Sequence, residues 1–163
     1  MKIIILGAGL VGAPMAIDLN KDSEFDVTVV DYSAKALQSI KAKAPELSTI
    51  QKDLSNPNDV TALVSDYDLV VNAVPGFMGF ETAKAIIEAE KNCACIAFYE
   101  EDPFELDALA KEKNVTMIMD CGVYPGMGSA LIMDVVQKLD EVESVLTYVG
   151  GLPEIREWPS EYK

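Results

Sequence analysis

Short apolar runs alternate with amphipathic patterns along most of the chain. The runs are rich in β-branched residues and predict six buried strands, at residues 2–6, 26–31, 47–52, 68–74, 93–98 and 115–120. Apolar residues three and four positions apart predict helices between the strands, including 10–20, 34–43 and 80–91. Such alternation is typical of an α/β protein, so we expect a doubly wound parallel sheet with helices on both faces.

Two further helices have clearly marked beginnings. Asn56 precedes Pro57 and Asp102 precedes Pro103, so in each case a capping side chain is followed by a proline whose missing N–H does no harm. Glu105 follows Asp102 by three positions, as in a capping box. We therefore expect helices to begin at these two prolines.

Pro14 lies inside the first predicted helix. A proline in a helix interior removes a backbone hydrogen bond and crowds the carbonyl group four residues back. Either this helix begins later than residue 10, or its first turn is distorted.

The pattern changes after residue 120. Glycines and a proline over residues 122–128 predict an irregular connection, followed by a helix at 130–139 and a strand at 143–149. From residue 150 a polar and aromatic tail contains no evident element. We predict one domain over residues 1–122 and the beginning of a second α/β domain, incomplete, over residues 123–163.

Composition narrows the classes of function. With 13 Lys and Arg against 27 Asp and Glu, the formal net charge is −14, which argues against nucleic acid as a partner and against an anionic membrane surface. No apolar run reaches the roughly 18 residues that span a bilayer, so no membrane segment is expected. The chain has no His, which excludes His-based triads and imidazole proton shuttles. Three cysteines and no recognisable export signal predict a reducing, cytoplasmic location.

A G-x-G-x-x-G pattern joins the first strand to the first helix. Gly7 allows the tight turn, Gly9 lets the backbone approach a pyrophosphate, and Gly12 permits close packing of the helix on the sheet. Main-chain amides here, including those of Leu10 and Val11, would hold the phosphates with the positive end of the helix dipole. This context predicts a Rossmann fold that binds a dinucleotide; the alternative is a turn that binds nothing.

An acid ends the second predicted strand. Asp31 stands about 20 residues after the glycines, where a carboxylate accepts hydrogen bonds from the adenosine ribose. It would repel a 2′-phosphate, and the adjacent Tyr32 and Ser33, which we also assign to the cofactor site, supply no compensating Arg. Lys35 is the nearest basic residue. We predict NAD as the cofactor rather than NADP.

Two more segments fall at the carboxyl ends of predicted strands, where ligands bind in such sheets. Asp53 and Leu54 are candidate adenine contacts, although Asp53 is equally well explained as a solvated loop acid. Ala73, Val74 and Pro75 are candidates for the pyrophosphate and the nicotinamide-side ribose, the alternative being a simple end of the strand.

The cysteines do not predict a metal site. Cys93 and Cys95 share one face of a predicted strand without the further ligands that zinc needs, so we interpret them as core thiols. Cys121 lies beside glycine in a loop with no basic activator nearby, which disfavours a nucleophilic role.

The segment D-C-G-V-Y-P-G at residues 120–126 resembles the D-x-G-x-x-P-G segment of the saccharopine dehydrogenase-like family, and most of all its lysine 6-dehydrogenase branch. Further agreement lies in the glycine loop and in residues 68–75, 148–153 and 161–163. The resemblance implies an NAD(P)-dependent oxidoreductase acting on an amino-acid C–N bond, in which a neutral amine gives hydride to the nicotinamide. Family members are longer and have a second α/β domain, so the resemblance also implies that this chain supplies the cofactor-binding half of the enzyme. It further implies that the enzyme is a homo-oligomer.

The same resemblance points to the residues nearest the substrate, namely Asp120, Gly122, Tyr124, Pro125 and Gly126. The Pro–Gly pair would cap the nicotinamide pocket while the acid orients the loop. Asp120 and Tyr124 are chemically able to move a proton, yet a loop acid and a packed aromatic explain them equally well, so no catalytic residue is assigned.

A second hypothesis is a regulatory module that senses NAD(H) without catalysis, as in the cytoplasmic domains of potassium channels and transporters. Such modules also open with strand, glycine loop and helix, and have acids after the second and third strands. The loop at 120–126 and the tail at 150–153 favour the enzyme, because a stand-alone sensor needs neither.

Overall fold

The computed structural model describes residues 1–149 of the chain. It divides into two compact units, Met1–Asp120 and a second that begins at Cys121, two residues before the boundary predicted from sequence. The predicted tail from residue 150, including the segment at 150–153 and the terminal 161–163, lies outside the described residues.

The first unit is built on one parallel sheet. Its six strands run in the order β3-β2-β1-β4-β5-β6. Strands β2 and β3 therefore extend the sheet on one side of β1, and β4, β5 and β6 extend it on the other. Leu6 at the end of β1 pairs with Val30 on one side and with Asn72 on the other. All six predicted strands are confirmed, with these bounds: β1 (Lys2–Leu6), β2 (Asp26–Asp31), β3 (Ser48–Gln51), β4 (Leu69–Asn72), β5 (Asn92–Cys95) and β6 (Met117–Ile118).

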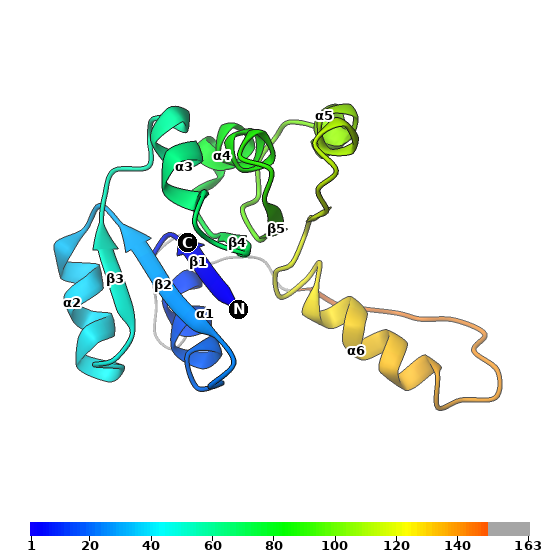
Figure 1. The fold of residues 1–163 in the computed structure, drawn as a ribbon. Helices are drawn as coiled ribbons and strands as arrows, with labels where there is room; N and C mark the ends of the chain where they lie inside the picture. The colour runs from blue at the N-terminus through cyan, green and yellow to red at the C-terminus, as the bar shows by residue number, and fades with distance from the viewer. Residues whose placement is uncertain (150–163) are drawn as a thin grey trace. The chain divides into compact units, whose positions relative to one another are not determined.

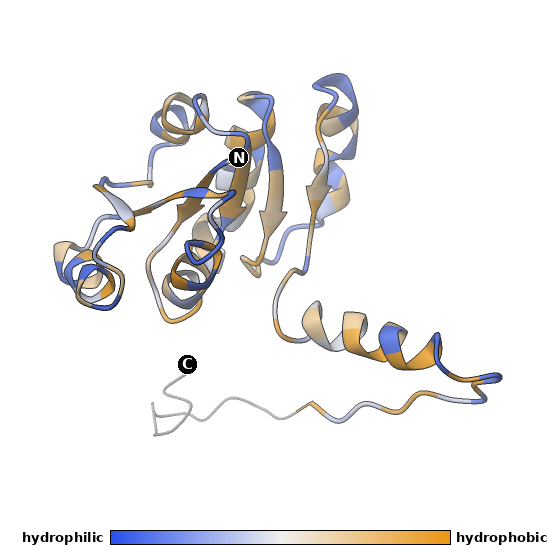
Figure 2. Cartoon of the chain, turned by 60° about the horizontal axis from the view of Figure 1, so that its bottom comes forward, coloured by the Kyte–Doolittle hydropathy of each residue, from blue (hydrophilic) through white to orange (hydrophobic). Residues whose placement is uncertain are grey.

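Helices cover both faces of this sheet, as predicted, with α1 and α2 on one side and α3 and α4 on the other (Figure 1). Strand side chains pack alternately against the two layers: Ile3 and Ile5 face α1 and α2, while Ile4 and Leu6 face α3 and α4. Burial on both faces explains why the central strands are mostly apolar in Figure 2. The helices of the unit are α1 (Gly12–Leu19), α2 (Ala34–Lys43), α3 (Pro57–Val64), α4 (Gly76–Glu88) and α5 (Asp107–Glu112).

Both predicted caps are confirmed. The Asn56 side chain accepts a hydrogen bond from the Asn58 N–H at 3.1 Å, and Asp102 accepts one from the Phe104 N–H at 2.9 Å. Beyond Asp102 the chain first makes a 3₁₀ turn, Pro103–Leu106, and only then enters α5.

Several predicted bounds are wrong. Helix α1 begins at Gly12, so Pro14 falls in its first turn, where its missing N–H has no helical partner to lose. Helix α4 begins at Gly76 instead of residue 80, because the glycines of its first turn hide the helical pattern. Strands β5 and β6 are shorter than their apolar runs, since the later residues of each run leave the ladder.

The second unit contains one helix among its described residues, α6 (Met127–Val136), which begins and ends three residues before the predicted one. The strand predicted at 143–149 is wrong: these residues are extended but pair with no described strand. A β-branched pattern favours a strand only where a partner completes the ladder, and none is present in the described part of the chain.

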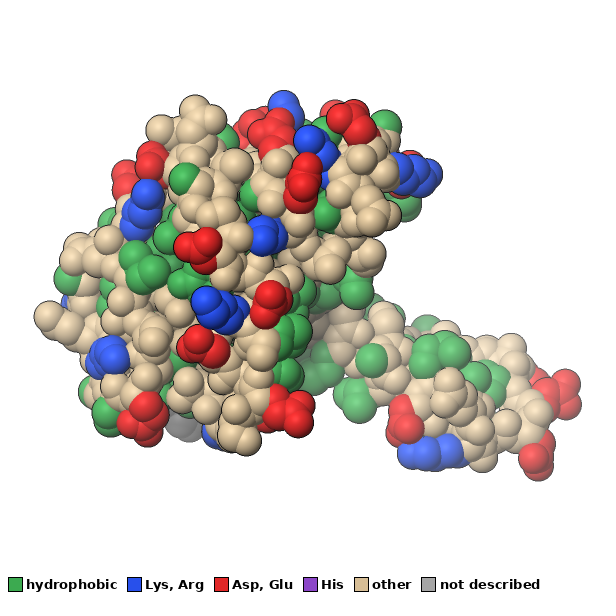
Figure 3. All heavy atoms as spheres, in the orientation of Figure 1, with side chains coloured by type: hydrophobic (Ala, Val, Ile, Leu, Met, Phe, Trp, Pro, Cys, Tyr) green, Lys and Arg blue, Asp and Glu red, His purple; other side chains and the backbone are tan. Residues whose placement is uncertain are grey.

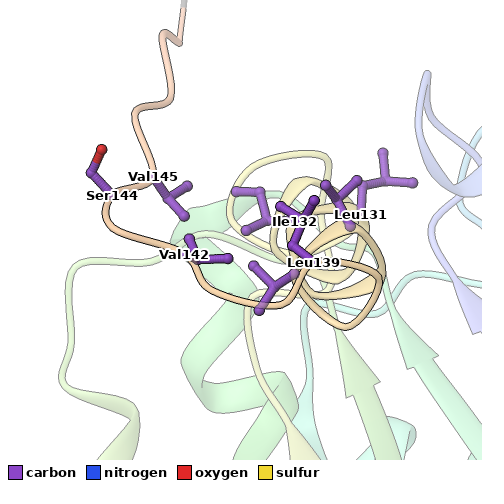
Figure 4. Close-up of a pocket in the computed structure, with 8 residues that line it drawn as sticks. Leu131, Ile132, Leu139, Val142, Ser144 and Val145 are labelled. Atoms are coloured by element: carbon purple, nitrogen blue, oxygen red, sulfur yellow. The ribbon is translucent and has the colours of Figure 1, made fainter.

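Helix α6 and the segment after it line an open apolar hollow of about 350 Å³ (Figure 4). Leu131, Val135 and Leu139 each expose more than half of their surface on this side of the unit. Among the described residues, no helix is both long enough and apolar enough to cross a membrane. The hollow is lined by Leu131, Ile132, Val135, Val136, Leu139, Val142, Ser144 and Val145.

The cap of α3 yields a testable prediction. Asn56→Ala removes the acceptor for the Asn58 N–H, so we expect the free energy of unfolding to fall by about 1 kcal/mol. Urea unfolding followed by circular dichroism measures the change. The matched control is Asn58→Ala, at an exposed helical position where alanine favours the helix. Equal stability of the two variants would contradict the capping role.

Candidate active site

The turn after β1 is held by backbone contacts that only glycine permits. Gly7 has φ +106°, a left-handed conformation, and its N–H donates to the Val30 carbonyl oxygen at 2.8 Å. A Cβ at Gly7 would lie 2.5 Å from the Ala73 carbonyl oxygen. A Cβ at Gly12 would overlap the Gly7 carbonyl oxygen and lie 3.2 Å from the Ala73 side chain. The first two turns at this edge of the sheet are therefore packed backbone against backbone.

Gly9 differs from its two neighbours in the motif. It is exposed, and a Cβ built on it would meet no atom within 4 Å. The amides of Leu10, Val11 and Gly12 donate to no acceptor in the described part of the chain, as expected for the start of a helix. Open space next to oriented N–H groups and the positive end of α1 fits a pyrophosphate.

The carboxylate of Asp31 is fixed across from this turn. Its Oδ2 accepts a hydrogen bond from the Ala8 N–H at 2.7 Å, and its Oδ1 accepts one from the Ser33 N–H at 2.8 Å. The Ser33 hydroxyl in turn caps α2 by accepting from the Ala36 N–H at 3.3 Å. The structure thus brings together the two features that the sequence predicted separately, the glycine loop and the acid.

One lysine near Asp31, Lys52, is already paired with another acid. The Lys52 N–H donates to the Asp31 carbonyl oxygen at 3.0 Å, while the Lys52 ammonium is paired with Asp59 at 3.0 Å. Tyr32 exposes 76% of its surface beside the carboxylate, and its carbonyl oxygen accepts a hydrogen bond from the Gln51 side chain at 3.1 Å. On the face seen in Figure 3, basic side chains are scattered among acidic ones and form no patch.

The structure separates the two candidate adenine contacts. Leu54 is buried in the core under α3, whereas Asp53 is exposed. Hydrogen bonds from the Ser55 main chain and hydroxyl hold the pKa of the Asp53 carboxyl below its ordinary value. Only Asp53 therefore presents its side chain to solvent at the end of β3.

The segment after β4 meets the glycine loop directly. Ala73 donates its N–H to the Leu6 carbonyl oxygen at 2.9 Å, and its own carbonyl oxygen contacts Gly7. Val74 is buried, and Pro75 is exposed at the N-cap position of α4. A second helix thus begins next to the first at the carboxyl edge of the sheet.

Three aromatic residues at this edge were missed by the sequence analysis. Phe77 and Phe98 expose 88% and 82% of their surfaces. Tyr99 is half-buried, with its hydroxyl 3.6 Å from the Met119 sulfur and its ring edge-on to Phe80. Burial, with the nearby Cys95 and Cys93, raises the pKa of the Tyr99 phenol. The apolar run at 93–98 hid Phe98, because an aromatic at the end of a strand looks like its continuation.

The substrate-side candidates fall into both units. Asp120 ends the first unit with φ +58° and is exposed. Gly122, Tyr124, Pro125 and Gly126 form one closed turn before α6, in which Gly122 pairs with Gly126. The Tyr124–Pro125 bond is cis, and the Tyr124 ring lies against the backbone of Gly128, where a side chain would overlap it.

Two of the three cysteines lie in the core of the first unit and the third in the second unit. Cys93 and Cys95 are buried on β5, and Cys121 is half-buried at the start of the second unit. Within residues 1–149, no three Cys, Asp or Glu side chains are grouped closely enough to hold a metal ion.

Comparison with known proteins identifies relatives of this chain. The family model for the saccharopine dehydrogenase NADP binding domain matches residues 3–118. Mitochondrial alpha-aminoadipic semialdehyde synthase of Rattus norvegicus is 26% identical over 169 residues, which cover 99% of this chain and 18% of the relative. Saccharopine dehydrogenase [NADP(+), L-glutamate-forming] of Pyricularia oryzae is 25% identical over 156 residues, covering 93% of this chain and 34% of the relative. The chain thus spans about a fifth to a third of these curated relatives.

Solved structures share the fold. Apo saccharopine dehydrogenase (L-Glu forming) from Saccharomyces cerevisiae superposes with a TM-score of 0.71 at 19% identity, covering 84% of this chain and 31% of that one. The WlbA dehydrogenase of Bordetella pertussis, in complex with NADH and UDP-GlcNAcA, gives 0.60 at 15% identity, covering 84% and 42%. At these identities the likeness establishes a Rossmann fold and nothing beyond it.

The open space at Gly9 generates a prediction. Gly9→Ala places a methyl group where nothing else in the protein lies, so we expect stability to change by less than about 0.5 kcal/mol. The same methyl group would stand between the amides and a pyrophosphate, and we expect dinucleotide affinity to fall by about tenfold or more, equivalent to about 1.4 kcal/mol. Calorimetric titration and thermal unfolding measure the two effects.

The matched control for Gly9→Ala is Gly12→Ala, whose methyl group overlaps the Gly7 carbonyl oxygen and should lower the melting temperature. A Gly9→Ala protein that binds dinucleotide as tightly as the parent would contradict the assignment of the phosphate site.

Proposed function

The chain belongs to the saccharopine dehydrogenase NADP-binding domain family, and we propose that it is the cofactor-binding part of an oxidoreductase that acts on the C–N bond of an amino acid. The observation that supports this most directly is the open space at Gly9, with helical N–H groups on one side and the fixed Asp31 carboxylate across from it. When bound, the nicotinamide ring supplies the group that exchanges hydride with the substrate.

The cofactor we propose is NAD(H), although the family is named for NADP. Asp31 is anchored by the N–H groups of Ala8 and Ser33, so its carboxylate cannot rotate away from an added 2′-phosphate. Lys52 is paired with Asp59 and is not available to compensate that charge. The anchored carboxylate instead suits the two ribose hydroxyls, which donate hydrogen bonds to it.

The substrate we propose is a small amino acid of the lysine or saccharopine type, in line with the names of the relatives. Asp120, Gly122, Tyr124, Pro125 and Gly126 are the residues we place nearest to it, with no general base assigned. We further propose a homo-oligomer in the cytoplasm, although some relatives are named as mitochondrial. The alternative, a sensing module without catalysis, gains no support from the relatives, whose names are those of enzymes.

Turnover tests the proposed reaction. Lysine or saccharopine added to the protein with NAD should increase the absorbance of reduced nicotinamide, at a rate that depends on the amino acid. Gly9→Ala serves as the control with impaired binding. Measured on the full-length protein of which we propose this chain to be a part, tight dinucleotide binding without reduction across a panel of amino acids would refute the enzyme and favour the sensing module.

Cofactor preference tests the role of Asp31. The parent protein should bind NAD more tightly than NADP, and Asp31→Asn, which removes the charge but keeps the size, should narrow that ratio by about tenfold. Titration of both cofactors into both proteins measures it. The control is Asp26→Asn, at the opposite end of β2. NADP binding equal to or tighter than NAD binding in the parent would overturn the assignment.

A further inference from the structure

Asn72 is a fully buried polar residue at the carboxyl end of β4, one residue before the Ala73–Pro75 segment. Its Nδ2 donates to the Gly79 carbonyl oxygen at 3.2 Å and to the Cys95 sulfur at 3.4 Å. Its main-chain carbonyl oxygen accepts from the N–H groups of Ile96 and Ala97, at 3.0 and 3.2 Å. One residue therefore joins β4, the first turn of α4 and the end of β5.

The bond to Gly79 closes a loop. Residues 73–78 run from β4 into α4, and the Asn72 side chain ties the start of that stretch to the residue immediately after it. Glycine is required on the far side of the loop as well: a side chain at Gly76 would overlap the Phe98 carbonyl oxygen, and one at Gly79 would strike the Tyr99 ring at 2.5 Å. The amide thus fixes the beginning of α4 against the end of β5.

Stability alone does not account for an asparagine here. Its Oδ1 is buried and has no hydrogen-bond partner among the described residues. A buried acceptor without a partner costs free energy, and leucine, of nearly the same size, would leave no such atom in this apolar layer. Residues that break such a local rule are commonly found at functional sites.

We propose that Asn72 is a positioning residue for the nicotinamide half of the cofactor: its amide holds the 73–76 segment in the conformation that receives the second phosphate and the nicotinamide-side ribose. This inference rests on the proposed function. It separates the site into two halves, because the adenosine half depends on the glycine loop and Asp31, whereas the hydrogen bonds of the Asn72 side chain go to Gly79 and Cys95.

The experiment compares two ligands on the 163-residue chain. AMP reports on the adenosine half alone, whereas NADH reports on both halves and changes its fluorescence when the nicotinamide enters a pocket. In Asn72→Leu, and in the smaller Asn72→Ser, we expect NADH affinity to fall by about tenfold, AMP affinity to stay within about twofold of the parent, and the NADH fluorescence change to diminish. Thr82→Val, at a buried polar residue within α4, should leave both affinities unchanged.

Each result decides between the alternatives. An unchanged ratio of NADH to AMP affinity in both variants would refute the positioning role while leaving the proposed function intact. An equal loss of affinity for NADH and AMP, or failure of both variants to unfold cooperatively, would show that Asn72 serves the stability of the domain. Either result would also refute the proposal. A parent protein that binds neither ligand would refute the proposed function itself, and the positioning role with it.

Discussion

The structure depends on how closely three backbone segments approach one another at the carboxyl end of β1. The turn at Gly7, the first turn of α1 at Gly12 and the peptide of Ala73 are in contact without an intervening side chain. Leu6 can then pair with strands on both of its sides, and two helices can begin at the same edge of the sheet. A single methyl group at Gly7 or Gly12 would separate these segments, so the sheet order and the proposed phosphate site have one common requirement.

Much of the fold was predictable because the central strands of this sheet are buried on both faces. Continuous apolar runs such as Ile3–Leu6 leave no other arrangement for a chain that must also place helices between them. The bounds of α4 were not predictable, since Gly76 and Gly79 are unfavourable in a helix and are required only by Phe98 and Tyr99, which lie some 20 residues away in sequence. The strand predicted at 143–149 was wrong for a related reason. Its residues favour a strand, but a strand also needs a partner segment, and the pattern of one segment does not show whether a partner is present.

The candidate site also has some features that the sequence predicts and others that it does not. The glycine spacing and Asp31 were recognisable because each position has a backbone or charge requirement that few residue types meet. The hydrogen bond from Ala8 to Asp31 was not, since Ala8 contributes only its main chain and any residue supplies an N–H. Asn72 escaped notice because an asparagine ending an apolar run looks like an ordinary strand terminus, and its significance appears only with Gly79 and Cys95 beside it.

A chain with a formal net charge of −14 is an unexpected host for an anionic cofactor. Nucleic acids require clustered Lys and Arg because each contact must replace a condensed counterion along a dense line of phosphates. One pyrophosphate makes no such demand, since main-chain N–H groups at a helix start stabilise it with dipoles that add no charge to the protein. Acidic side chains remain compatible with this arrangement provided that they do not lie next to the phosphates. Asp31 meets that condition, because the bonds from Ala8 and Ser33 hold its carboxylate at the end of β2, on the side where a ribose would lie. The acidity of this chain is therefore compatible with binding a dinucleotide, and under the NAD(H) assignment that we propose the phosphate it excludes is the 2′-phosphate, which would lie against Asp31.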